Sequence, residues 1–252
     1  MVVSKIITAL VLTLTFTAIP ANVAKAGYLY VADVDSTPST GAFVNLPINA
    51  QTVNIEPDHS LFEMAVMYTP SGGIGDTIEI GVTTDPALNG DNNPHWFVFS
   101  WINGAPQGYD SGSDFVSDIS NFWSSPLTLY EGTSERVGFE YSNSNWLLTL
   151  NGTTAGYFPG SEWSGVFTMS SFIEVYGEVY QTGSDSPTMD GTVSGYDSFA
   201  GGELSTLVVD YPYEQLDASR TGFTALGPVP EPATWAMMAA GVGIMLGFRR
   251  RR

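Results

Sequence analysis

Two stretches of the chain alternate between apolar and polar side chains, which is the pattern of a β-strand with one buried face. In residues 171–180 the apolar positions are Ile173, Val175 and Val179. The opposite side carries aromatic rings together with Glu174 and Glu178. This pattern predicts a strand with an aliphatic inner face. The acidic outer face is open to two interpretations, an ordinary solvated surface or a functional site.

The second stretch, residues 76–84, alternates in the same way. Its inward positions are Ile78, Ile80 and Val82, and its outward positions are Thr77, Glu79, Gly81 and Thr83. A single glutamate again interrupts a small or neutral face, beside a glycine that allows another group to approach closely. Two strands that each present a glutamate on the face away from their aliphatic residues can place a pair of carboxylates in one site.

Shorter runs of the same kind predict strands through most of the chain, separated by turns rich in Gly, Pro, Asn and Asp. The expected strands cover residues 28–32, 42–47, 61–69, 95–102, 135–141, 145–150, 192–198 and 204–209. No long amphipathic helix and no internal repeat is apparent. The fold class predicted is therefore all-β, an antiparallel β-sandwich.

Charge and composition exclude several kinds of chemistry. The formal net charge is −18, and between the two terminal segments only Arg136 and Arg220 are basic, so nucleic-acid binding is not expected. The chain has no Cys and no Lys after Lys25, which removes thiolate and Schiff-base chemistry. With only His59 and His95, a three-histidine metal site is impossible. We expect no metal or cofactor, and carboxylates and tyrosines as the reactive groups.

The loop at residues 84–94 contains Asp85, Asn89 and Asp91, whose oxygens are of the type that binds calcium. They lack the regular one-residue spacing of a calcium loop, and turn formation accounts for them better. His95, at the start of the next strand, is interpreted as a strand-edge residue rather than as a ligand.

The N-terminal segment has the three parts of a secretory signal peptide. Lys5 precedes an apolar run at residues 6–19, and Ala24-Lys25-Ala26 provides a small-x-small cleavage site. We expect residues 1–26 to be removed by signal peptidase after Ala26. An uncleaved membrane anchor is the alternative.

The C-terminal segment combines Pro230-Glu231-Pro232, an apolar run at residues 233–248 and four arginines at residues 249–252. Sixteen helical residues span about 24 Å, which predicts a short transmembrane helix with its arginines in the cytoplasm. This arrangement resembles the PEP-CTERM sorting signal of Gram-negative bacteria. The resemblance implies that an exosortase recognises Pro230, Glu231 and Pro232, and that a membrane-anchored precursor is exported to the cell surface or the extracellular space.

Between these ends, residues 27–216 form the expected β-sandwich domain and residues 217–228 a linker to the sorting signal at 229–252. The order of motifs in the domain resembles the neprosin family over residues 60–185. The first half of the resemblance rests on Glu79-Ile80-Gly81-Val82, Asp85-Pro86, Asn89-Gly90-Asp91 and His95-Trp96-Phe97-Val98. The second half rests on Trp146, Gly156-Tyr157-Phe158-Pro159 and Tyr176-Gly177-Glu178-Val179.

Neprosins are glutamic endopeptidases built on an antiparallel β-sandwich, known for cleaving after proline. The resemblance implies a peptide or protein substrate and assigns the two catalytic glutamates to Glu79 and Glu178, both of which the alternation also singles out. One carboxyl group would keep its proton while the other activates water. The sequence does not determine which glutamate is the acid and which is the base.

The sequence thus favours an exported glutamic endopeptidase. The alternative is a non-catalytic surface or matrix β-sandwich that binds polysaccharide through its tryptophans. The two hypotheses differ in geometry, because a peptidase needs Glu79 and Glu178 in one site, with their carboxylates within about one water of each other.

Overall fold

The computed structural model describes residues 27–49, 53, 58–70, 75–181, 188–209 and 214–225. The predicted signal peptide, transmembrane helix and Pro-Glu-Pro motif lie outside these residues. Among the helices of the described ranges, none is long and apolar enough to cross a membrane.

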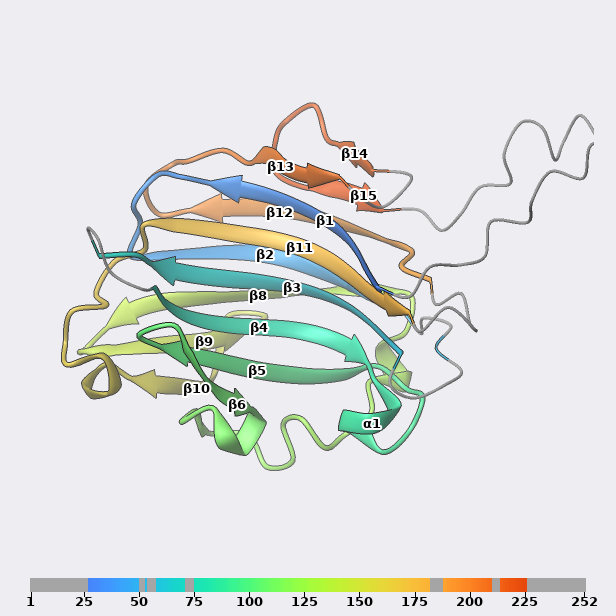
Figure 1. Cartoon of the computed structure of the whole chain (residues 1–252), viewed down its shortest axis with the longest axis horizontal. Coiled ribbons are helices and arrows are strands. Elements are labelled where there is room, and N and C mark those ends of the chain that lie inside the picture. The colour runs from blue at the N-terminus through green and yellow to red at the C-terminus, as the bar shows by residue number, and fades with distance from the viewer. Residues whose placement is uncertain are drawn as a thin grey trace, which may run out of the picture.

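Two antiparallel sheets lie face to face and confirm the predicted β-sandwich (Figure 1). The first sheet has seven strands, in the order β13 (Ser205–Val209), β1 (Gly27–Asp35), β11 (Phe172–Gln181), β3 (His59–Tyr68), β4 (Asp76–Thr84), β5 (His95–Ile102) and β6 (Ala105–Tyr109). The central pairs β11–β3, β3–β4 and β4–β5 run in continuous register.

The second sheet has eight strands. Their order is β14 (Glu214–Leu216), β15 (Phe223–Ala225), β12 (Gly191–Ser198), β2 (Gly41–Ile48), β8 (Thr133–Ser142), β9 (Asn145–Leu150), β10 (Thr153–Pro159) and β7 (Val116–Ser117). Helical structure in the described ranges is limited to α1 (Pro86–Asn89) and three short 3-10 turns, η1 (Asp110–Gly112), η2 (Thr128–Tyr130) and η3 (Gly160–Trp163).

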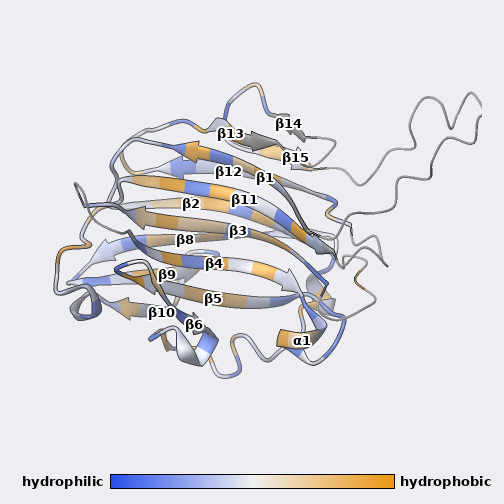
Figure 2. Cartoon of the chain, in the orientation of Figure 1, coloured by the Kyte–Doolittle hydropathy of each residue, from blue (hydrophilic) through white to orange (hydrophobic). Residues whose placement is uncertain are grey.

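The hydrophobic core lies between the sheets. Val175 of β11 and Ile80 of β4 are fully buried there, together with Val44, Phe139 and Trp146 of the second sheet. The predicted inward positions of β11 and β4 all belong to this core, which confirms the alternation in both strands. In Figure 2 hydrophobic and hydrophilic positions follow one another along β11 and β4, as expected of strands whose two faces differ.

Some strands of the structure were not predicted from the sequence. β15 falls inside the range 217–228 that was expected to be a linker, and it pairs with both β12 and β14. Phe223 and Ala225 are buried there, but a three-residue strand is too short to show a period. β6 and β10 were not among the predicted strands either; β6 pairs with β5, and β10 pairs with β9 and β7.

Candidate active site

Four glutamates share one face of the seven-stranded sheet, the face turned away from the second sheet. We call Glu63, Glu79, Glu174 and Glu178 the carboxylate cluster, and this side of the sheet the outer face. Strand register places them in three successive rows, because directly paired residues point to the same side of a sheet. Glu178 pairs with Leu61, Tyr176 pairs with Glu63, and Glu174 pairs with Ala65, which pairs in turn with Glu79.

The structure brings the two glutamates predicted from sequence, Glu79 and Glu178, to this same outer face. They lie on β4 and β11, which are separated by β3. Their rows are offset by four residues, so their Cα atoms are about 10 Å apart across the sheet and about 13 Å apart along it. Glu63 of β3 occupies the row between them.

Glu79 lies in a largely apolar environment at the edge of an aromatic cluster. Trp101 donates a hydrogen bond from Nε1 to Glu79 Oε1 over 3.0 Å, and its ring packs at 5.5 Å from Phe99. Burial raises the pKa of Glu79 to about 7, against a lowering contribution from the Trp101 hydrogen bond and with further upward contributions from the charges of Glu174 and Glu178. Glu79 therefore holds its proton in mildly acidic solution.

Glu63 is the most deeply buried member of the carboxylate cluster, with 2% of its surface exposed. Burial raises its pKa well above the usual value, and the charges of Glu79, Glu178 and Glu174 raise it further, while hydrogen bonding with Tyr176 lowers it. Sequence analysis did not select Glu63.

Glu178 has a different environment from Glu79 and Glu63. Its side chain is 20% exposed, and its Oε1 lies 3.0 Å from Nε2 of His59, the first residue of β3. The His59 ring stacks on Tyr180 at 5.6 Å, which fixes its orientation. A protonated imidazole at this distance stabilises the carboxylate form of Glu178.

Glu174 is engaged by a phenol rather than by a cation. Tyr30 of β1 donates a hydrogen bond from its hydroxyl to Glu174 Oε1 over 2.9 Å, and the Tyr30 ring packs at 5.0 Å from Tyr176. Burial raises the pKa of Glu174, and the Tyr30 hydrogen bond partly offsets this effect. The pKa values of the Tyr30 and Tyr176 hydroxyls are raised by burial and by the neighbouring glutamates, so both phenols remain neutral.

Among the residues that the structure describes, neither arginine neutralises the carboxylate cluster, and there is no lysine. Between the terminal segments the sequence has only Arg136 and Arg220 as permanent cations. Arg136 contacts Asp197 and donates to the Gly195 carbonyl in the second sheet, and Arg220 lies near Glu203. The raised pKa values of Glu63, Glu79 and Glu174 favour the protonated form of these three residues, which relieves repulsion within the cluster.

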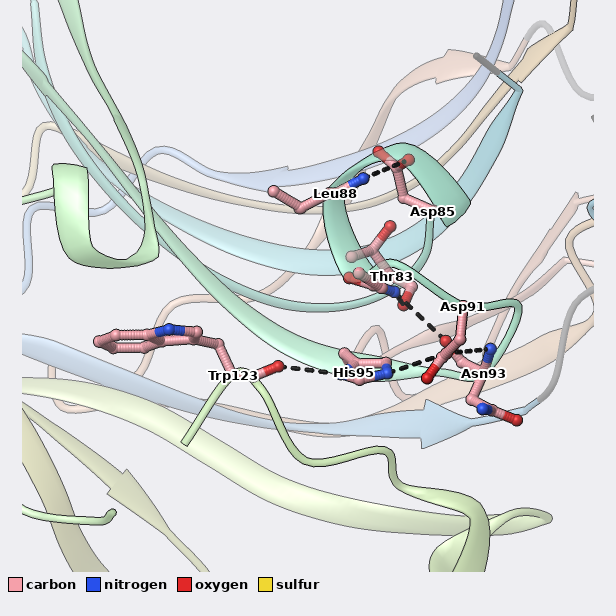
Figure 3. Close-up of polar contacts among 8 residues, drawn as sticks. Thr83, Asp85, Leu88, Asp91, Asn93, His95 and Trp123 are labelled. Atoms are coloured by element: carbon pink, nitrogen blue, oxygen red, sulfur yellow. Dashed lines mark hydrogen bonds and ion pairs between the residues drawn. The ribbon is translucent and has the colours of Figure 1, made fainter. Parts of the chain in front are cut away.

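The acidic loop before β5 uses its oxygens in local hydrogen bonds (Figure 3). Asp85 accepts from the backbone N–H groups of Ala87 and Leu88 and so caps α1. Asp91 accepts from Asn93 N and lies 3.1 Å from Nε2 of His95, whose Nδ1 contacts the Trp123 carbonyl. These contacts support the interpretation of the loop as a turn.

Other features of the described chain lie apart from the carboxylate cluster. Within the described ranges, no three His, Asp or Glu side chains are arranged to hold a metal ion. A cavity of about 310 Å³ is lined by Trp96, Phe122, Leu127 and Tyr130, among others, and by none of the four clustered glutamates. Neither feature points to a second reactive centre.

Comparison with protein families gives two matches. Residues 56–200 match the model of the neprosin family, which spans 145 of the 252 residues and includes all four clustered glutamates. Residues 228–252 match the PEP-CTERM protein-sorting motif.

Solved structures with similar architecture include two peptidases and a congerin. Scytalido-glutamic peptidase with a peptide-based transition-state analogue has 13% identity and a TM-score of 0.44, covering 81% of this chain and 98% of that chain. SCP-B, an eqolisin peptidase in complex with the tripeptide Ala-Ile-His, has 9% identity and a TM-score of 0.40, with the same coverage. A congerin II double mutant has 15% identity and a TM-score of 0.36, covering 66% of this chain and 99% of its own.

Proposed function

Because the chain belongs to the neprosin family, we propose that it is a glutamic endopeptidase whose acid/base pair is Glu79 and Glu178. The observation that carries the proposal is the contrast between the two side chains on one face. Glu79 has a pKa of about 7 and therefore keeps its proton in mildly acidic solution. Glu178 Oε1 lies 3.0 Å from His59 Nε2. One protonated and one ionised carboxyl group are what metal-free hydrolysis of an amide requires.

We propose a role for each glutamate on the basis of its environment. Glu178 as carboxylate takes a proton from a water molecule, whose oxygen forms a bond to the carbonyl carbon of the peptide. Glu79 as neutral acid first donates a hydrogen bond to the carbonyl oxygen and then gives its proton to the leaving amine, as the C–N bond breaks and its electron pair moves to nitrogen. In this arrangement the peptide segment lies above β3, the strand between β4 and β11.

The outer face suits an extended peptide substrate. Aromatic rings surround the glutamates, with Phe97 and Phe99 on β5, Tyr109 on β6 and Tyr176 on β11. Phe97 and Phe99 are themselves buried, whereas Tyr109 is 46% exposed and its ring can pack against a proline or another apolar side chain of the substrate. We propose cleavage next to proline as the preference to test first, in keeping with the neprosin family.

The test is digestion of an unfolded, proline-containing protein between about pH 3 and 6, where a carboxylate pair shares one proton. Glu79→Gln and Glu178→Gln should each lower kcat by at least about 100-fold and leave Tm nearly unchanged, since glutamine keeps the shape but carries no acidic proton. The double variant should be little worse than either single variant if the two residues act as one unit.

Glu174→Gln is the matched control, because it removes a carboxyl group from the same face without touching either proposed catalytic residue. It should keep most of the activity. Full cleavage by Glu178→Gln, or no cleavage by the wild type at any acidic pH, would favour the non-catalytic polysaccharide-binding alternative.

The PEP-CTERM motif indicates export in Gram-negative bacteria through a membrane-anchored precursor. We propose that an exosortase then cleaves the tail at Pro230-Glu231-Pro232, which leaves the domain at the cell surface or outside the cell. Mass spectrometry of the exported protein should find a terminus near this motif. An intact Arg252 terminus in the exported wild-type protein would argue against processing.

A further inference from the structure

Glu63 occupies the position from which one side chain can reach both proposed catalytic glutamates. It pairs directly with Tyr176 on one side and Gly81 on the other. Glu178 lies two residues from Tyr176 on β11, and Glu79 lies two residues from Gly81 on β4. The two glutamates lie on opposite sides of the Glu63 row. Both are therefore diagonal neighbours of Glu63, at about 7–8 Å between Cα atoms, a separation that two long side chains can bridge.

One oxygen of Glu63 has no partner. Oε1 is buried and makes no hydrogen bond with any other described residue. Leaving a buried acceptor unsatisfied costs about 1–3 kcal/mol, and burying an unpaired charge costs more. Packing does not explain why a buried glutamate with this free-energy cost lies at the centre of the outer face, because leucine or methionine would fill the same space without an unsatisfied oxygen.

The groups that face Glu63 come from five strands. They are Tyr30 of β1, Glu174, Tyr176 and Glu178 of β11, Glu79 of β4 and Tyr109 of β6, together with the non-titrating ring of Phe97 of β5. The charges among them are all negative, so Glu63 is surrounded by groups that favour its neutral form. In that form it has one proton to give and a second oxygen to receive another.

The packing around Gly81 holds Glu63 in place. A Cβ atom added at Gly81 would lie 2.7 Å from Glu63 Cβ and 2.4 Å from the Phe97 ring. The missing side chain therefore lets the Glu63 stem and the Phe97 ring close over β4. This is the close approach that the glycine near Glu79 suggested, and the groups that approach are the Phe97 ring and the stem of a third glutamate.

We propose that Glu63 is a proton relay that connects Glu178 to Glu79, a role that rests on the proposed function. After cleavage Glu178 carries the proton taken from water, and Glu79 has lost its own to the leaving amine. Glu63 gives its proton from one oxygen to the Glu79 carboxylate and receives the proton of Glu178 on the other. Glu178 is then ionised, Glu79 and Glu63 are neutral, and no net proton has been gained or lost.

The relay explains features that a two-carboxyl mechanism leaves unexplained. Glu79 and Glu178 are two rows apart, too far for direct proton transfer between their carboxyls across β3. A carboxylic acid on the intervening strand provides two oxygens at the right place. Glu63 is accordingly a positioning and relay residue and does not contact the substrate carbonyl.

The experiment compares Glu63→Gln with Glu174→Gln in the full chain, using a proline-containing peptide at pH 5. Glutamine at position 63 keeps size and neutrality but cannot pass a proton from one oxygen to the other. We expect kcat of Glu63→Gln to fall by about 100-fold, with KM within about twofold and Tm nearly unchanged. Glu174→Gln should keep most of its kcat.

A second variant separates a relay from a packing role. In Glu63→Ala, added formate supplies a small carboxyl group in the space that the side chain leaves, and it should restore kcat by at least about tenfold. Formate should not restore Glu63→Gln, where the amide fills that space. Loss of activity in Glu63→Ala that formate does not relieve would overturn the relay and assign Glu63 to packing.

The outcomes also distinguish the relay from the function on which it rests. If Glu79→Gln and Glu178→Gln are inactive while Glu63→Gln turns over at the wild-type rate, the relay is wrong and the catalytic pair stands. If Glu79→Gln remains active, the proposed catalytic pair itself fails.

Discussion

The carboxylate cluster and the loop between β4 and β5 both concentrate acidic side chains, and the two regions treat those charges in opposite ways. In the loop, burial is the largest single influence on the pKa of Asp91 and raises it, but the hydrogen bonds from Asn93 and His95 together outweigh burial and bring the pKa below its usual value. On the outer face, burial dominates and raises the pKa values of Glu63 and Glu79. The loop satisfies its oxygens with N–H donors, and the cluster leaves one oxygen of Glu63 without any.

This difference separates acids that build the fold from acids that are available for chemistry. A carboxylate that accepts backbone N–H bonds is stabilised as an ion and its proton is lost early. A carboxyl buried among others keeps its proton, at a cost in folding free energy, and can deliver it at mildly acidic pH. Three experiments test whether the two groups of acidic residues differ in this way.

The largest expected effect is a loss of stability as the pH rises. The folded-state pKa of Glu79 is raised from 4.5 to about 7. Between these values the folded chain binds a proton that the unfolded chain has released, so the free energy of unfolding falls with increasing pH. The contribution is at most about 3 kcal/mol, because residual contact with water screens this partly buried group. Urea unfolding from pH 4 to 7.5 should show the decline, and Glu79→Gln should flatten it.

The loop is expected to show the opposite pH dependence, so that a rise in pH does not destabilise the chain through Asp91. Asp91 has a lowered folded-state pKa, so its contribution is present at neutral pH and disappears on acidification. That change lies below the usual Asp pKa of 3.8, so Asp91 contributes little to the slope between pH 4 and 7.5. An unfolding free energy that rises steadily over this range would contradict the raised pKa of Glu79.

A medium effect is expected from two glycine substitutions. Gly81→Ala forces a Cβ against Glu63 and Phe97, which should cost about 1–3 kcal/mol and lower kcat. Gly90 ends α1 with φ of +79° and has no atom within 4 Å of an added Cβ. Gly90→Ala should therefore cost about 1 kcal/mol of backbone strain and leave kcat unchanged. Thermal unfolding and peptide cleavage measure both, and equal losses of activity would contradict the comparison.

The smallest effect is expected in the loop itself. Asp91→Asn removes the charge that His95 contacts but keeps an oxygen for the Asn93 N–H. The loss should be below about 1 kcal/mol, since Asp91 is 40% exposed. Activity should not change, and chemical denaturation with a cleavage assay tests both. A loss of kcat above tenfold would connect the loop to the chemistry.

Much of the fold was predictable because its strands are half-buried. β11 and β4 each present apolar residues to the core at period two, so the sequence indicates both their existence and their faces. The order of strands was not predictable, because β1 lies beside β11 although Tyr30 and its partner Glu178 are 148 positions apart in the sequence. Non-local pairing of this kind leaves no local pattern.

The site was predictable only in part. Glu79 and Glu178 stand out against neutral or aliphatic surroundings. Glu63 belongs to a strand that is buried on both faces, so its sequence Leu61-Phe62-Glu63-Met64-Ala65-Val66 shows no alternation. The available signal was the single carboxylate itself, because a charge in an apolar run is costly unless it has a use. His59 and Trp101 give no such signal, since their partners are distant in sequence.

Within the carboxylate cluster, Glu63 and Glu79 hold protons near neutral pH. A direct titration of the glutamates tests this most directly. ¹³C-labelled glutamate in the full chain gives one side-chain carboxyl resonance per residue by NMR, and Glu79→Gln and Glu63→Gln assign two of them by loss of a signal. We expect a midpoint of about pH 7 for Glu79 and a midpoint well above the usual glutamate range for Glu63. Titration of both residues below pH 5, together with the exposed glutamates, would contradict this expectation.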